Sequence, residues 1–160
     1  DLPPGIYNVA FANGIWRGVE VKSGETTVLE LGTLQIEGGQ NDIGGYALLD
    51  SETGEVLKKP SVFRDLALIP GPITISNGHL EWPMIEIRAG EIARINPARF
   101  SVSGSNAGDY LVTTVDGRSA GTVSKLISLP VPPGHYVVDV EGQKMTDELN
   151  EGQTHTITVE

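Results

Sequence analysis

The residues that could do chemistry in this chain are few and scattered. Nucleophilic and acid–base catalysis need groups held within hydrogen-bond reach of one another, with a partner that orients the base. His79, His135 and His155 are the three histidines, and they share no motif. The chain has no cysteine, which excludes thiolate chemistry and disulfides. We interpret the histidines as turn or strand-surface residues and predict that the protein is not an enzyme.

Clustered carboxylates raise the question of a metal site. Hard cations such as calcium prefer several oxygen ligands that converge from a loop. Three groups are candidates: Asp50, Glu52 and Glu55; Asp147, Glu148 and Glu151; and Asn41 with Asp42 in the Gly-rich stretch 38–45. None has the spacing of an EF-hand, and the Gly-rich stretch lacks the Lys-Ser/Thr ending of a phosphate loop. We predict solvated turn charges with no metal and no cofactor; structural calcium is the alternative.

Trp16 and Trp82 are the sharpest functional hint. They lie between a turn and a strand, out of phase with inward residues such as Val19 and Ile85. An exposed tryptophan can stack on a sugar or anchor a protein partner. Alternatively, each ring covers the end of its own sandwich or packs between neighbouring units, which we favour because the third copy has polar residues at 144–146. The two tryptophans are therefore speculative ligand or partner contacts.

Alternation of side chains predicts the elements that position these residues. Tyr7, Val9 and Phe11 alternate with smaller or polar residues, which is the pattern of a half-buried strand. Turn signals follow at Asn13-Gly14 and at 23–25. We expect a second strand around Val19 and Val21, and a third over 28–31. No stretch has the periodicity of a helix.

This pattern returns along the chain as an internal repeat of about 66 residues. The glycine pairs Gly5/Gly24 and Gly71/Gly90 are each 19 residues apart, and a third copy begins at Gly134. Trp16 aligns with Trp82 in this register. We therefore predict two β-sandwich modules over 33–97 and 98–160, each of about seven strands. Residues 1–32 would be the second half of an incomplete module. We expect a longer protein from which this is a C-terminal piece; packing of the first strands on a neighbour is the alternative.

The amino-acid composition limits the kinds of molecule that the protein is expected to bind. The 160 residues carry a formal charge of −10, which argues against nucleic acid, because phosphate binding depends on Lys and Arg. Twenty Gly and ten Pro favour strands and turns. No apolar run approaches the ~20 residues of a membrane span, so we expect no membrane insertion. Asp1 is not a natural start, and we expect a processed or shortened chain.

The strings VDGRSAGTVSK (115–125), LPVPPGHYVVDVEG (129–142) and EGQTHTITVE (151–160) resemble PEGA-type repeats. LPPGIYNVAF (2–11) with GVEVKSGETTVLELG (18–32) is similar to half-modules of carboxypeptidase-regulatory-like and Cna-B-type sandwiches, which also trail von Willebrand type A domains in bacterial proteins. The resemblance implies a non-catalytic, antiparallel, Ig-like or transthyretin-like accessory module of surface proteins. Residues 33–38 and 100–104 contain no lysine, so no isopeptide crosslink of the Cna-B kind is expected.

Together these patterns favour an all-β, tandem-repeat segment of a larger exported or surface-associated bacterial protein. It would act as a spacer or protein-binding module, outside the cytoplasm. Its partners would be another protein or neighbouring domains of the same polypeptide, with self-association through exposed strand edges as a further option. The alternative is a carbohydrate-binding module that uses exposed Trp16 and Trp82.

Overall fold

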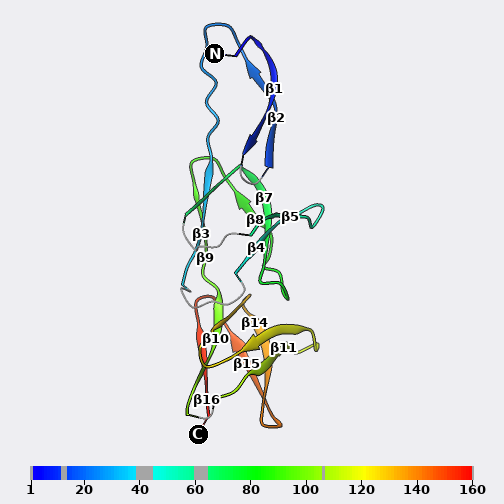
Figure 1. The fold of residues 1–160 in the computed structure, drawn as a ribbon, viewed down its shortest axis with the longest axis vertical. Coiled ribbons are helices and arrows are strands. Elements are labelled where there is room, and N and C mark those ends of the chain that lie inside the picture. Colours follow the sequence, from blue (N-terminus) through cyan, green and yellow to red (C-terminus); the bar gives the residue numbers. More distant parts are fainter. Residues whose placement is uncertain (1, 12–13, 39–44, 60–64, 106, 160) are drawn as a thin grey trace.

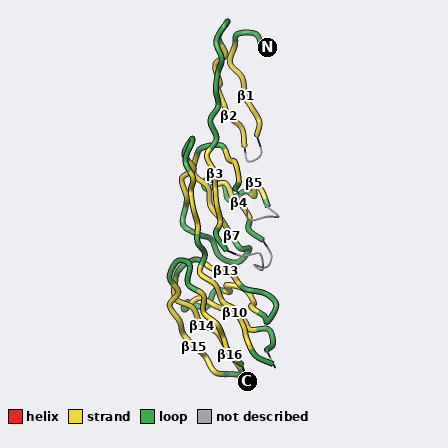
Figure 2. The backbone as a smooth tube through the Cα atoms, turned by 90° about the vertical axis from the view of Figure 1, so that its left-hand side faces the viewer, coloured by secondary structure: helices red, strands yellow, loops and turns green. Residues whose placement is uncertain are grey.

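The computed structural model describes residues 2–11, 14–38, 45–59, 65–105 and 107–159. The regular structure of these residues is all strand, with no helix, which confirms the all-β prediction. No helix of the described part is therefore long and apolar enough to cross a membrane. The strands form five sheets along an elongated body, and the two termini lie at its opposite ends (Figures 1 and 2).

An antiparallel hairpin of β1 (Gly5–Phe11) and β2 (Gly14–Val21) forms the N-terminal end. Residues 22–31 continue without strand structure and lead into β3. We call residues 2–31 the hairpin segment. None of its described residues is fully buried.

The middle unit, residues 32–95, consists of two sheets. Their strand orders are β6-β3-β9 and β5-β4-β7-β8. The strands are β3 (Gly32–Ile36), β4 (Ala47–Asp50), β5 (Val56–Lys58), β6 (Leu66–Leu68), β7 (Gly71–Ser76), β8 (Ile85–Ile87) and β9 (Ile92–Ile95).

The C-terminal unit, residues 98–159, has the same arrangement. Its sheets have the orders β13-β10-β16 and β12-β11-β14-β15. The strands are β10 (Ala98–Ser103), β11 (Tyr110–Thr114), β12 (Ser119–Val123), β13 (Leu129–Val131), β14 (Gly134–Val140), β15 (Gln143–Leu149) and β16 (Thr154–Thr158). In each unit the first and last strands pair in parallel, β3 with β9 and β10 with β16; the other pairs are antiparallel.

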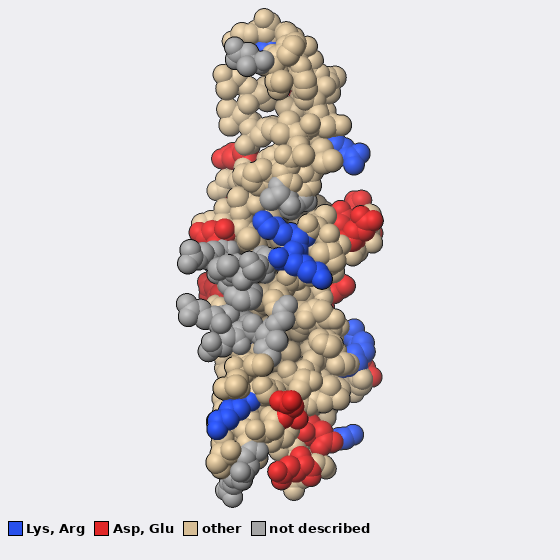
Figure 3. Space-filling model, in the orientation of Figure 1, with Lys and Arg blue, Asp and Glu red and all other residues tan. Residues whose placement is uncertain are grey.

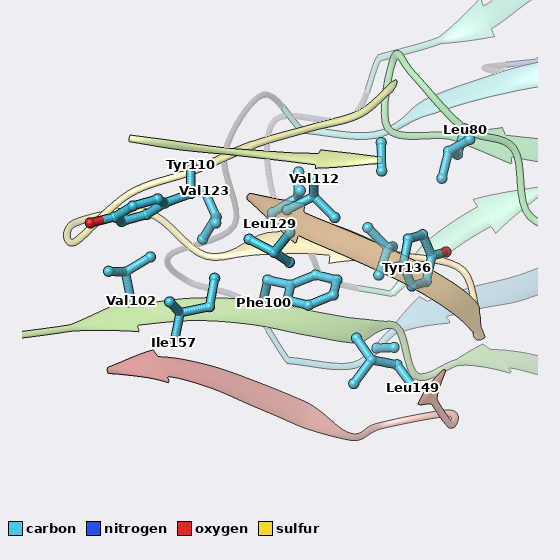
Figure 4. Packing of buried hydrophobic residues seen from close by; sticks show 14 of the residues in the cluster. Leu80, Phe100, Val102, Tyr110, Val112, Val123, Leu129, Tyr136, Leu149 and Ile157 are labelled. Carbon is cyan, nitrogen blue, oxygen red and sulfur yellow. The ribbon is translucent and has the colours of Figure 1, made fainter. Parts of the chain in front are cut away.

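Each unit has its own hydrophobic cluster between its two sheets. Leu34, Leu48 and Ile75 are fully buried in the middle unit. Phe100 and Val112 are fully buried in the C-terminal unit, where side chains from facing strands meet (Figure 4). The predicted division into 1–32, 33–97 and 98–160 is compatible with this distribution of strands and stays a prediction.

The prediction of a third strand over 28–31 is wrong. These residues have no strand structure, and Val28 is 79% exposed. The corresponding strands later in the chain, β9 and β16, each pair in parallel with the first strand of their unit. No described strand pairs with 28–31 in that way, so apolar character alone does not make this segment a strand.

Candidate functional site

The two repeated tryptophans have different environments. Trp82 is 5% exposed and belongs to the middle unit's cluster, where its ring meets Tyr46 edge-on at 5.5 Å between centroids. Its backbone N–H donates to the Ile75 carbonyl at 2.8 Å. Trp16 lies on β2 opposite Val9 and is half-buried, with its ring 6.2 Å from that of Phe11. Equivalent positions in sequence therefore have unequal burial.

This difference bears on the carbohydrate alternative. Stacking on a sugar needs an exposed ring face, and Trp82 does not offer one. Its ring packs inside the middle unit's hydrophobic cluster, whereas the favoured interpretation places it over the end of its sandwich or between neighbouring units. In the C-terminal unit Met145 takes the equivalent place, since it faces Val138 as Trp16 faces Val9. A row of exposed aromatic rings is therefore not formed by these three positions.

Two of the three histidines lie beside one cleft. His79 and His135 line an open hollow of about 700 Å³ between the middle and C-terminal units, together with Glu81, Asp116 and Arg118. His135 Nε2 is 3.9 Å from a Glu148 carboxylate oxygen, and both side chains are mostly exposed. The sequence pattern did not anticipate that His79 and His135 share a cleft, because they belong to different repeats.

His155 lies elsewhere and has a structural contact. Its Nδ1 is 2.5 Å from a carboxylate oxygen of Asp147, and its ring is 5.7 Å from that of Phe100. Because His155 is on β16 and Asp147 on β15, the contact joins the two sheets of the C-terminal unit. The pair therefore connects the edges of a sandwich.

Asp50, from the first candidate metal group, closes a turn with its side chain. Asp50 Oδ1 accepts hydrogen bonds from the backbone N–H groups of Thr53, at 2.8 Å, and Glu52, at 2.9 Å. These bonds lower the pKa of the Asp50 carboxyl. Its oxygens thus bind the chain itself, in the way of an Asx turn.

A second carboxylate is held in the same way at the β11–β12 turn. Asp116 accepts hydrogen bonds from the Thr114 hydroxyl and, at 3.0 Å, from Arg118 Nε. The Thr114 bond is the main cause of a lowered Asp116 pKa, and the positive charge of Arg118 adds to it. No three His, Asp or Glu side chains within the described ranges converge as a metal site. Asn41 and Asp42 lie outside the described residues.

The best-built polar site is the junction between the two units, and sequence reasoning missed it. Asn77, which follows β7, donates from Nδ2 to the carbonyl of Pro130 at 2.7 Å and to that of Ala120 at 3.4 Å. Its Oδ1 accepts from the backbone N–H groups of His79 and Leu80, at 2.9 and 2.8 Å. One side chain therefore shapes a loop of the middle unit and ties it to the C-terminal unit.

Leu80, in the same loop, extends its side chain across the junction into the C-terminal unit. It is 7% exposed and packs in the C-terminal unit's cluster, although it belongs to the middle unit's chain segment (Figure 4). Gly121 makes room nearby, because a Cβ there would lie 2.7 Å from Leu129 and 3.4 Å from His79. A second tie comes from Arg99, whose Nη2 donates to the Glu37 carbonyl at 2.5 Å. The repeat offered one signal: position 80 carries leucine where the first copy has Gly14.

Comparison with known proteins adds little beyond this geometry. No protein-family model matches the sequence, and no curated protein matches it. Among solved structures, the chain is similar to one described as the Bacillus anthracis TIE protein, with 14% sequence identity and a TM-score of 0.33. The match covers 81% of this chain and 33% of that one, so the chain spans about a third of that structure's length.

Proposed function

We propose that this chain is a non-catalytic structural segment that holds neighbouring parts of a larger protein at a fixed distance and orientation. The observation that carries the proposal is the junction made by Asn77 and Leu80. A flexible string of modules would have exposed, flexible polar linkers and few contacts across each boundary. Here the connection between β9 and β10 is two residues long.

The contacts across the junction are of the kind that resist bending. Leu80 fills space in a hydrophobic cluster, and such packing tolerates little displacement. Asn77 Nδ2 donates to two carbonyls of the C-terminal unit, so rotation between the units would leave the Ala120 and Pro130 carbonyls without this partner. Its Oδ1 holds the loop in place through the N–H groups of His79 and Leu80. Arg99 contacts the carbonyl of Glu37, which directly follows the middle unit's first strand. Because these contacts involve different strands, together they oppose both bending and twisting of one unit relative to the other.

The larger setting follows from the resemblance to PEGA-type and Cna-B-type repeats and is part of the proposal. The segment would belong to an exported or surface-associated bacterial protein and would contact other domains of that polypeptide or a protein partner. A formal net charge of −10 suits a solvated spacer, because it keeps the surface hydrated and disfavours aggregation.

Distance measurement between two spin labels tests the spacer function. Since the chain has no cysteine, Glu86→Cys and Lys144→Cys place unique labels on exposed positions of β8 and β15. We expect a single narrow distance distribution. Adding Leu80→Ala with Asn77→Ala should broaden it, whereas Leu126→Ala, at a leucine that is 84% exposed, should not. A broad distribution in the labelled protein without these changes would contradict the proposal.

A further inference from the structure

The hairpin segment has the inner face of a sandwich without the second half that would cover it. Tyr136 and Val138 on β14 are each 2% exposed, and Ile75 on β7 is fully buried. Their counterparts Tyr7 and Val9 on β1 are only half-buried. The side chains are of the same kind and alternate in the same way. What differs is the set of strands around them.

Two edges of the hairpin segment are open. In the other units β7 lies between β4 and β8, and β14 lies between β11 and β15. Among the described strands β1 is hydrogen-bonded to β2 alone. The segment 25–31, which matches β9 and β16, has no parallel partner comparable to β3 or β10. Open strand edges invite the addition of further strands.

In the C-terminal unit, one continuous stretch of chain supplies the strands that pair with β14 and with β16. Residues 98–131 contain β10, which pairs in parallel with β16, and β11, which pairs with β14. They also contain the outer strands β12 and β13. This stretch directly precedes the turn at 132–134.

The same turn precedes β1 and is already formed there. The Tyr136 hydroxyl donates to the Pro132 carbonyl at 2.5 Å, and the Tyr7 hydroxyl donates to the Pro3 carbonyl at 2.7 Å. The chain therefore enters β1 as it enters β14. A four-stranded stretch that precedes this turn would therefore lie on the same side of β1 as residues 98–131 lie on β14.

We propose that the hairpin segment is an acceptor surface for a four-stranded segment of the same kind as 98–131, joined to it on the N-terminal side of Leu2. Its first strand would add in parallel to 25–31 and its second would add antiparallel to β1, with alternate apolar side chains covering Tyr7, Val9 and Trp16. Recognition would combine backbone pairing with apolar contact.

The surface chemistry fits such an apolar partner. Phe11 lies on the same face of β1 as Tyr7 and Val9 and is 41% exposed, and Leu2, which precedes the turn, is 60% exposed. The end of the molecule that carries the hairpin also shows few charged side chains in the view of Figure 3. The inference goes beyond the spacer function, because it holds whether or not the junction between the other units is rigid.

The test fuses a copy of residues 98–130 directly before Leu2 of the full chain, so that Leu2 takes the place of Val131. A Trp82→Phe background leaves Trp16 as the reporter. A second fusion uses a copy of residues 32–67, the corresponding stretch of the middle unit, in case the first fails to fold. A matched control fusion changes Phe100, Val102 and Val112 of the added copy to Ser.

We expect at least one of the two intact fusions to shift Trp16 emission to shorter wavelength and to slow exchange of the Tyr7 and Val9 amides by about 100-fold or more. The control fusion should do neither. Unchanged Trp16 emission and amide exchange in both intact fusions would overturn the inference. It would also be overturned if the unfused chain is a dimer by light scattering with these amides already protected, since a second copy would then be the occupant.

Discussion

The hairpin segment and the matching part of the middle unit follow one sequence pattern and reach different degrees of burial. Gly24 and Gly90 close equivalent turns with φ of +74° and +70°, in the left-handed region that favours glycine. Trp16 and Trp82 have the same position in the predicted repeat, yet only Trp82 is buried. Local sequence therefore sets the hairpin and its turns. Strands from elsewhere in the chain set the burial of the apolar face.

The comparison extends to strand formation itself. Residues 92–95 form β9 because β3 offers a parallel partner, whereas 28–31 remain without strand structure. The hairpin segment has its hairpin, in which pairing is local, and has no strand of the kind whose pairing is distant in sequence.

Removing each tryptophan should separate the two regions most clearly. Trp82→Ala should destabilise the middle unit by about 3–5 kcal/mol, because it empties a buried site beside Tyr46. Trp16→Ala should cost less than about 1.5 kcal/mol, since its ring is already partly in water. Urea denaturation of both variants measures the two costs. Equal losses would contradict the contrast.

Leu80 should contribute much more to stability than an ordinary loop residue does. Leu80→Ala should lower the free energy of unfolding of the C-terminal unit by about 2–4 kcal/mol, because the side chain fills that unit's cluster. Leu126→Ala removes the same atoms from an exposed site and should change stability by less than about 0.5 kcal/mol. If the two variants unfold at the same urea concentration, the packing of Leu80 is not as described.

Alkaline pH should destabilise the C-terminal unit through Tyr136. Burial raises the pKa of this phenol from 10.0 to about 12. The unfolded chain loses the proton near pH 10 and the folded chain holds it to near pH 12, so stability is full below pH 10 and falls as the pH rises from 10 to 12. The loss should be roughly 2 kcal/mol. Tyr136→Phe should remove this part of the pH dependence; an unchanged profile in that variant would assign it to other groups.

The amide of Asn77 can be dissected with two substitutions. Asn77→Ala removes all four of its hydrogen bonds and should cost about 1–2 kcal/mol. Asn77→Asp keeps an acceptor for the N–H groups of His79 and Leu80, but it loses the donor and brings a charge toward two carbonyls. It should therefore be no more stable than Asn77→Ala in a thermal melt. Asn77→Asp with the melting temperature of the unchanged protein would rule out the inter-unit bonds.

The strand pattern was open to prediction because alternation and turn residues depend on neighbours in sequence. Alternation at Tyr7, Val9 and Phe11 and glycine at the turns indicate hairpins directly. The third strand at 28–31 was predicted wrongly because its apolar residues satisfy the local rule, while its pairing depends on a distant strand. The parallel pairing of β3 with β9 and of β10 with β16 likewise has no local signal.

The junction escaped prediction for a related reason. An Asn-Gly pair such as Asn77-Gly78 marks a turn, and nothing in the sequence says that the Asn77 amide bonds carbonyls more than forty residues away. Leu80 looks like a loop residue until the second unit is placed beside it. For the tryptophans, the sequence indicated that Trp16 and Trp82 share a repeat position, but it did not indicate that their burial differs.

Native-state hydrogen exchange compares the two regions most directly. Amides of β1 and β2 have a neighbour on one side, whereas those of β14 have neighbours on both sides. We expect the Tyr7 and Val9 amides to exchange through local opening, at least about 100-fold faster than those of Tyr136 and Val138. Equal protection of the two hairpins in the monomeric protein would contradict the account that the first is half of a sandwich.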